Sequence, residues 1–257
     1  MLRDRLLPKL RGSARAGGFL VLTLVQLGAV EAHERLVAPD RRPAVFQRHM
    51  RGWVRRLLRM FGVSLSIEPS QAPPQRAKAR LIVSNHRSPM DIAVLLEIFG
   101  GQVLSRGDLE SWPVLGLAAR KAGTIFVDRT DGVSGATAIR LIQKRLKNGA
   151  TIIVFPEGTT FAGDEVQPFR AGAFIGAQHI DLEIVCVGVA YEQGAEFVGE
   201  TFLQHLGRTA VRPRTRVAVR IGQPLPPSGR AAELAERLRI EVQSLVHQAR
   251  ADLNRAK

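Results

Sequence analysis

The sequence predicts an α/β fold, in which a mixed β-sheet is flanked by helices and preceded by a membrane-associated helical segment. From about residue 67, short aliphatic runs alternate with longer stretches whose apolar residues recur at helical spacing. Such alternation is typical of a sheet covered by helices. The 257 residues allow one large domain with a substantial core. We therefore divide the chain into an N-terminal segment, 1–66, and an α/β domain, 67–257.

The short aliphatic runs predict the strands, and the stretches between and after them predict the helices. The expected strands are Arg80–Ser84, Gly101–Leu104, Thr124–Val127, Thr151–Phe155, Ile184–Ala190 and Arg216–Ile221. The expected helices are Pro89–Phe99, Pro113–Ala122, Val133–Lys147, Ala171–His179 and Ala231–Asn254. In an open sheet of this kind, ligands bind beyond the carboxyl ends of the strands. Residues that directly follow a strand are therefore the candidates for a functional site.

Charge and cysteine content limit the class of protein. The formal net charge is +14, and 31 of the 37 basic residues are arginine, whose guanidinium suits bidentate contact with phosphate. The excess predicts an anionic partner, either nucleic acid or a membrane surface. A genomic bias towards arginine is the alternative explanation. The single cysteine, Cys186, excludes an internal disulfide, and neither it nor the six histidines form a metal-binding pattern.

The first 66 residues predict a segment that associates with a membrane. The apolar run from Gly17 to Val30 is about 21 Å long as a helix, which is short for a hydrocarbon core of about 30 Å. Arginines flank it and no clear cleavage site follows, so we expect a re-entrant or interfacial helix rather than a signal peptide. From Phe46 to Phe61, apolar residues share one face and arginines the other, as in helices that lie in a membrane interface. Packing on the protein's own core is the alternative for this second helix.

The first candidate site follows the expected strand that ends at Ser84. Asn85 and His86 enter a turn, Ser88 is a plausible N-cap, and Asp91 then lies in the first helical turn. If the chain folds back here, the carboxylate meets one imidazole nitrogen and the other serves as a general base. Alternatively, Asp91 only stabilises the amino end of the helix through its dipole.

Two further strands end in polar residues. Arg129 follows one of them and could bind a phosphate through two of its guanidinium nitrogens. Gly158 and Thr159 follow another and could donate from backbone N–H and hydroxyl groups, while Glu157 could accept from a sugar or glycerol hydroxyl. Solvated strand ends, or a turn built on Pro-Glu-Gly, are the alternatives.

Together these motifs resemble those of the glycerolipid acyltransferases, the family typified by bacterial 1-acyl-glycerol-3-phosphate acyltransferase. The resemblance covers about residues 51–226. Its first three blocks are Asn85-His86 with Asp91, Gly123 to Arg129, and Phe155 to Thr159, and the third is followed by a similar segment at Phe169-Arg170-Ala171-Gly172. Arg106 stands where relatives often have lysine. The fourth block of the family carries proline in an apolar strand, and here Leu182 to Val189 contains none.

The resemblance implies a glycerol-3-phosphate acyltransferase-like fold and a direct acyl transfer. His86, oriented by Asp91, would deprotonate the hydroxyl of 1-acyl-sn-glycerol-3-phosphate, which would attack acyl-CoA or an acyl-carrier-protein thioester to form phosphatidic acid. The chain contains no G-x-S-x-G motif for a covalent intermediate. The residues expected to bind substrate are Asn85, Arg106, Arg129, Glu157, Gly158 and Thr159.

We therefore expect an enzyme at the cytoplasmic face of the inner membrane, peripheral or monotopic. Its partners would be a lysophospholipid, the acyl donor and the membrane surface, with no nucleic acid, no metal and no cofactor beyond the acyl-carrying co-substrate. The alternatives are an O-acyltransferase for another lysolipid, such as lyso-ornithine lipid, and a non-catalytic basic protein that binds membrane or nucleic acid.

Overall fold

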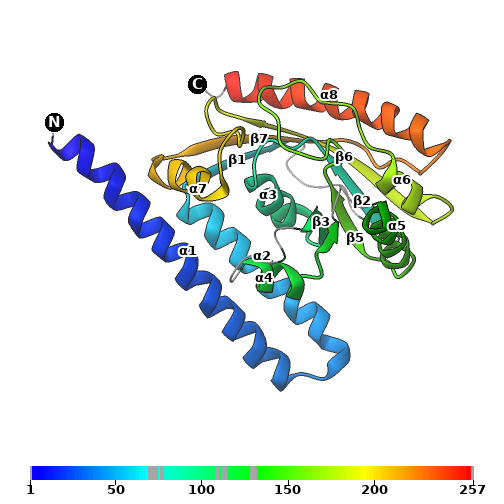
Figure 1. The fold of residues 1–257 in the computed structure, drawn as a ribbon, viewed down its shortest axis with the longest axis horizontal. Coiled ribbons are helices and arrows are strands. Elements are labelled where there is room, and N and C mark those ends of the chain that lie inside the picture. The colour runs from blue at the N-terminus through cyan, green and yellow to red at the C-terminus, as the bar shows by residue number, and fades with distance from the viewer. Residues whose placement is uncertain are drawn as a thin grey trace.

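A mixed β-sheet forms the centre of the computed structural model, which describes residues 2–68, 75, 78–107, 110, 115–127 and 132–255. Within these residues the sheet has seven strands in the order β1-β7-β6-β2-β5-β3-β4 (Figure 1). The strands are β1 (Val63–Glu68), β2 (Ala79–Ser84), β3 (Gln102–Arg106), β4 (Ile125–Val127), β5 (Thr151–Val154), β6 (Leu182–Tyr191) and β7 (Thr215–Ile221). Only β6 and β7 pair antiparallel among these neighbours. The predicted mixed α/β fold is confirmed.

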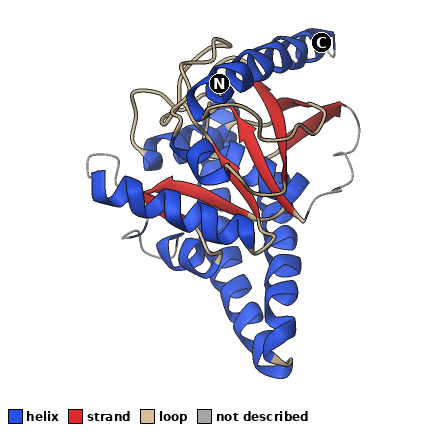
Figure 2. Cartoon of the chain, turned by 90° about the vertical axis from the view of Figure 1, so that its right-hand side faces the viewer, coloured by secondary structure: helices blue, strands red, loops and turns tan. Residues whose placement is uncertain are grey.

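Helices cover both faces of the sheet (Figures 1 and 2). They are α1 (Leu2–Leu36), α2 (Arg42–Met60), α3 (Met90–Phe99), α4 (Leu115–Lys121), α5 (Gly132–Lys147), α6 (Gly172–Ala177), α7 (Phe202–Val211) and α8 (Ala231–Arg255), with a short 3-10 turn η1 (Pro39–Arg41). One core cluster lies between the sheet and α5, α6 and α8, and a second lies between the sheet and α2 and α3. The sheet therefore has a hydrophobic core on each of its faces.

The central strand β6 shows how the sequence builds this arrangement. All ten of its residues are buried, and it pairs with β2 on one side and β7 on the other. Alternate side chains enter opposite clusters: Ile184 and Cys186 face α8, while Val185 and Val187 face α3. A proline here would remove a donor from a strand that is paired on both sides. The absence of proline from this block therefore fits a doubly paired strand.

The structure contains two elements that the sequence analysis did not predict. Strand β1 pairs with β7 and begins at Val63, so the sheet starts before residue 67 and the N-terminal helices end at Met60. Helix α7 begins with a capping box between Thr201 and Gln204. Both elements are short, and because of β1 the sheet begins within the segment that we assign to residues 1–66.

The amphipathic helix predicted from Phe46 to Phe61 is present as α2, but its apolar face does not face a membrane. Val54 is fully buried and Leu58 is buried with it against α3 and the sheet, and Leu57 is also buried. The expectation that this face enters a membrane interface is therefore wrong, because the protein's own core covers it.

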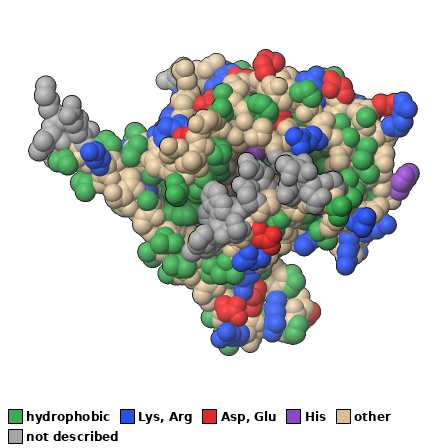
Figure 3. Space-filling model, in the orientation of Figure 1, with side chains coloured by type: hydrophobic (Ala, Val, Ile, Leu, Met, Phe, Trp, Pro, Cys, Tyr) green, Lys and Arg blue, Asp and Glu red, His purple; other side chains and the backbone are tan. Residues whose placement is uncertain are grey.

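Helix α1 instead carries the exposed apolar surface. Its segment Leu6–Leu36 is the one described helix long and apolar enough to cross a membrane by length and composition, criteria that a core helix or a signal sequence also meets. The predicted apolar run is thus part of a much longer helix. Leu20, Val21, Leu24 and Val25 are exposed, while the opposite side packs on α2 and α7. Figure 3 shows hydrophobic side chains along α1 and charged ones at the tip of the α1–α2 hairpin.

We predict that Gly188→Ala lowers the free energy of unfolding by about 1–3 kcal/mol, because α8 approaches β6 too closely for a side chain. A Cβ on Gly188 would lie 2.3 Å from the backbone carbon of Leu245. The matched control is Gly135→Ala in α5, where a Cβ meets nothing within 4 Å and should be neutral or stabilising. Chemical denaturation measures both variants. Equal stability of the two would contradict the close packing.

Candidate active site

His86 and Asp91 meet at the carboxyl end of β2. His86 lies on the loop after the strand and Asp91 lies in the first turn of α3, and His86 Nδ1 is 2.8 Å from Asp91 Oδ2. The same oxygen accepts backbone N–H groups from Arg87 at 2.6 Å and Ser88 at 2.9 Å. Because a carboxylate only accepts, Nδ1 of His86 carries the proton and Nε2 is left as a base. The predicted fold-back of the chain is therefore present.

The other oxygen of Asp91 faces a buried tyrosine. Asp91 Oδ1 and the Tyr191 hydroxyl are both buried, and neither has a partner among the described residues apart from their own side-chain contact. Burial, followed by the negative charge of Asp91, raises the pKa of Tyr191 well above its ordinary value. The phenol beside the Asp91 carboxylate therefore stays protonated.

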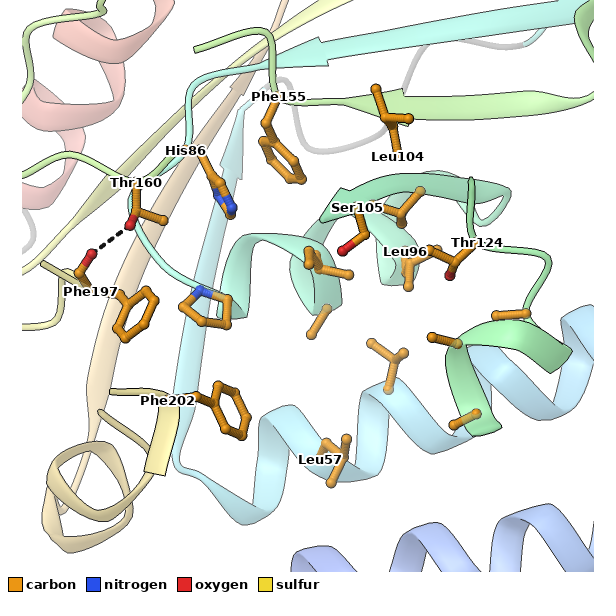
Figure 4. Close-up of a pocket in the computed structure, with 18 of the residues that line it drawn as sticks. Leu57, His86, Leu96, Leu104, Ser105, Thr124, Phe155, Thr160, Phe197 and Phe202 are labelled. Atoms are coloured by element: carbon orange, nitrogen blue, oxygen red, sulfur yellow. Dashed lines mark hydrogen bonds between the residues drawn. The ribbon is translucent and has the colours of Figure 1, made fainter. Parts of the chain in front are cut away.

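His86 points into a largely apolar cavity of about 540 Å³ (Figure 4). Its ring stacks on Phe155, with ring centroids 4.1 Å apart and planes 16° from parallel. The cavity runs between α2, α3, β3 and α4, and Leu57, Leu96 and Leu104 are among its apolar lining residues. Its polar lining near His86 includes Thr159. An apolar cavity with a base at its polar end suits a substrate that carries a hydrocarbon chain.

A buried ion pair ties the loop after β2 to the loop after β5. Arg87 Nη1 donates to both carboxylate oxygens of Glu157, at 2.9 and 3.1 Å, and the remaining guanidinium nitrogens donate to the backbone oxygens of Gly163 and Glu165. Glu157 also accepts the backbone N–H groups of His86 and Gln167.

The expectation that Glu157 binds a glycerol or sugar hydroxyl is therefore not met. Its side chain is fully buried, and both of its oxygens already accept hydrogen bonds from the protein. A substrate hydroxyl would have to displace a backbone donor from a buried carboxylate, which is costly. Glu157 holds the backbone of His86 in place instead.

Asn85 also holds the loop rather than facing the cavity. It is fully buried, its amide nitrogen donates to the carbonyl oxygen of Val189 at 2.8 Å, and its amide oxygen accepts the N–H of the same residue at 2.8 Å. The side chain thereby continues the pairing of β2 with β6 by one residue. We expected Asn85 to contact the substrate, but its side chain instead stabilises the loop.

The remaining predicted substrate residues differ in where they lie. Gly158 and Thr159 line the cavity beside His86, and Gly158 adopts a φ of +87°, a left-handed conformation that favours glycine. Arg106 ends β3, but its side chain is outside the described part of the structure. Arg129 also falls outside the described residues. The roles of Arg106 and Arg129 stay predictions.

The structure brings one further cation to this edge of the sheet. A Cβ on Gly158 would lie 2.8 Å from Nε of Arg170, so this exposed guanidinium lies directly over the glycine. The sequence motif contained Arg170, but only the fold places it beside Gly158 and Thr159. Arg170 is therefore a candidate contact for an anionic headgroup.

This geometry defines a class of enzyme that activates a nucleophile beside a hydrocarbon-binding cavity. A family model described as Acyltransferase matches residues 67–190. A lyso-ornithine lipid O-acyltransferase from Pseudomonas aeruginosa is 33% identical over 243 residues, which cover 91% of each chain. A 1-acyl-sn-glycerol-3-phosphate acyltransferase from Neisseria gonorrhoeae is 26% identical over 129 residues, 50% of this chain and 51% of the relative.

A solved structure has the same fold. The crystal structure of the 1-acyl-sn-glycerophosphate (LPA) acyltransferase PlsC from Thermotoga maritima matches with a TM-score of 0.68 at 22% identity, over 92% of this chain and 98% of that one. The chain belongs to the lysolipid acyltransferase family.

We predict that His86→Ala lowers kcat by about 10²–10⁴-fold, because the general base is lost while the fold is kept. Acyl transfer in the membrane fraction, together with the thermal unfolding midpoint, measures the effect. His247→Ala is the matched control, since His247 is exposed on α8 and its recorded hydrogen bond is to Gln243. Near wild-type turnover in His86→Ala would exclude His86 as the base.

Proposed function

We propose that this acyltransferase moves a fatty acyl group from a thioester donor to the hydroxyl of a lyso-ornithine lipid. The observation that carries this choice of acceptor is the similarity to a lyso-ornithine lipid O-acyltransferase over 91% of both chains. The acceptor implied by the motifs, 1-acyl-sn-glycerol-3-phosphate, is the second candidate. It is supported by relatives that match about half of the chain, from Neisseria gonorrhoeae and Neisseria meningitidis.

The proposed reaction is a direct transfer. His86 Nε2 takes the proton of the acceptor hydroxyl, and the oxygen attacks the carbonyl carbon of the thioester. The carbon–sulfur bond then breaks, and the imidazolium returns its proton to the leaving thiolate of CoA or acyl carrier protein. The products are an ester and a free thiol, so no cofactor and no covalent enzyme intermediate are needed. Asp91 stabilises the imidazolium that forms between the two proton transfers.

The cavity and its polar end support a division of the substrates. A fatty acyl chain fits the apolar space between α2, α3 and α4, with its carbonyl carbon beside His86. The anionic headgroup would lie near Thr159 and Arg170, together with Arg106 and Arg129. Ornithine offers a carboxylate and glycerol phosphate offers a phosphate, and guanidinium groups can bind either one through two hydrogen bonds. Arginine alone therefore does not select between the acceptors.

We infer that the protein acts at a membrane surface, on its cytoplasmic face, as a peripheral or monotopic enzyme. The exposed apolar side of α1 would enter the lipid. The hairpin tip exposes Arg35, Asp40, Arg41 and Arg42, which are costly to bury in hydrocarbon. A helix that lies along the surface satisfies both constraints, and it delivers lipid substrates close to the cavity.

The proposed acceptor is tested by a panel of lysolipids. The purified membrane fraction is incubated with labelled acyl-CoA or acyl carrier protein and with either lyso-ornithine lipid or 1-acyl-sn-glycerol-3-phosphate, with His86→Ala membranes as the blank. We predict a kcat/KM at least ~10-fold higher for lyso-ornithine lipid, which corresponds to about 1.4 kcal/mol of preferential transition-state binding. A preference for 1-acyl-sn-glycerol-3-phosphate would select the second candidate, and no transfer to either would exclude both.

A further inference from the structure

A second histidine–carboxylate pair lies directly behind the catalytic loop. Nε2 of His205 is 3.0 Å from Oγ of Ser88, and Nδ1 of His205 is 2.8 Å from Oε1 of Glu200. Ser88 is fully buried and His205 is 4% exposed. Ser88 lies between His86 and Asp91 in the chain, and its backbone N–H donates to the Asp91 carboxylate. The pair thus touches the turn that brings the catalytic residues together.

The Ser88–His205–Glu200 series has the order of a nucleophile, a base and an orienting carboxylate, but it does not form a second catalytic site. Neither Ser88 nor His205 is among the residues that line the cavity, and the Ser88 hydroxyl is enclosed by protein. A thioester in the cavity therefore cannot reach Ser88. Glu200 does line the cavity, but Ser88 and His205 do not, so these two residues act on the loop rather than on the substrate.

His205 is itself held firmly. The capping box of Thr201 and Gln204 fixes the start of α7, and Arg208 donates to the carboxylate of Glu200. The ring of Phe197 meets the ring of His205 edge-on, with centroids 5.0 Å apart. Arg15 of α1 donates to backbone oxygens at the other end of α7. These contacts hold the imidazole of His205 in one position, from which it can orient the catalytic loop.

The protonation of His205 follows from its partners. The Glu200 carboxylate only accepts, so Nδ1 carries the proton and Nε2 accepts from the Ser88 hydroxyl. Arg208 Nη2 lies 3.0 Å from the same Nδ1, and it donates to the Glu200 carboxylate instead. Burial lowers the pKa of His205, although the hydrogen bond and charge of Glu200 and the charge of Asp91 oppose this shift and the charge of Arg208 adds to it. The neutral imidazole of His205 therefore accepts the shorter of the two hydrogen bonds that Ser88 Oγ makes. The longer one, from the backbone N–H of Met90, is 3.3 Å.

We propose that His205 is a positioning residue for acyl transfer: through Ser88 it fixes the turn that directs Asp91 onto His86. This inference rests on the proposed function, because it concerns the same general base. The same segment supports the loop a second time, where the N–H of Phe197 donates to the carbonyl oxygen of Arg87 at 2.8 Å. Loss of the His205 contact leaves a buried hydroxyl without its short hydrogen bond, and the turn is free to shift. Displacements of about 1 Å at a reacting group can cost about 10²-fold in rate.

Two isosteric variants separate the contacts of His205. In His205→Asn the amide replaces Nδ1, so the bond to Glu200 is kept and the bond to Ser88 is lost. In His205→Gln the amide replaces Nε2, so the reach to Ser88 is kept. We expect His205→Asn and Ser88→Ala each to lower kcat by about 10–10²-fold, with KM changed by less than ~2-fold, and His205→Gln to recover most of the activity.

The double variant and the comparison of kcat with KM distinguish positioning from a loss of stability. The double variant Ser88→Ala, His205→Asn should lower kcat no further than either change alone, because both changes remove the same hydrogen bond, the one between Ser88 and His205. The charged groups around this loop are Asp91, Glu157, Arg87, Glu200 and Arg208, and all are unchanged in these variants.

The control is Thr209→Val on the same helix, which removes a buried hydroxyl that has no recorded partner among the described residues. It should leave kcat and KM unchanged. Folded His205→Asn with wild-type kcat, additive losses in the double variant, or no recovery of activity in His205→Gln would overturn the positioning role. His86→Ala, assayed in parallel, separates the two proposals: if it stays active, the proposed mechanism fails first, and if it is inactive while His205→Asn is not, only the inference about His205 fails.

Discussion

The buried carboxylate of Asp91 is the constraint on which the rest of the site depends. An ionised carboxylate without solvent is costly unless hydrogen bonds replace the lost water. Asp91 obtains three donors from its own turn, from His86 Nδ1 and the N–H groups of Arg87 and Ser88. This is possible only if the chain leaves β2, turns, and enters α3 at once. The same requirement therefore shapes the backbone and sets the tautomer of the base.

The loop is stabilised by groups that a motif comparison would assign to substrate. The side chain of Asn85 forms two hydrogen bonds with the backbone of Val189 in β6. The buried ion pair of Arg87 and Glu157 joins the loops after β2 and β5. Ser88 is held from behind by His205. With these polar groups satisfied by protein, Nε2 of His86 and the lining at Gly158 and Thr159 remain for substrate. The site thus combines a rigid polar support with an apolar cavity.

The sequence predicted those parts of the fold and site that depend on local pattern. The buried runs gave the positions of β2 to β7, and the turn between strand and helix suggested the hydrogen bond of His86 with Asp91, with a helix-dipole role of Asp91 as the alternative. The features that the sequence did not predict depend on tertiary packing. The apolar face of α2 belongs to the core, and Glu157 is paired with Arg87, because both depend on neighbours that are distant in the chain. Likewise, the contact of His205 with Ser88 spans 117 residues and has no signature in the sequence.

The most direct measurement is a double-mutant cycle on the catalytic pair, with Asp91→Asn, His86→Ala and the combined variant assayed for acyl transfer at equal folded concentration. Asparagine keeps the shape of Asp91 but cannot stabilise the imidazolium, so the account predicts a loss in kcat of about 10²–10⁴-fold for Asp91→Asn. The combined variant should be no slower than His86→Ala, because the two residues act as one unit. Near wild-type turnover in Asp91→Asn, or losses that multiply in the combined variant, would contradict the account.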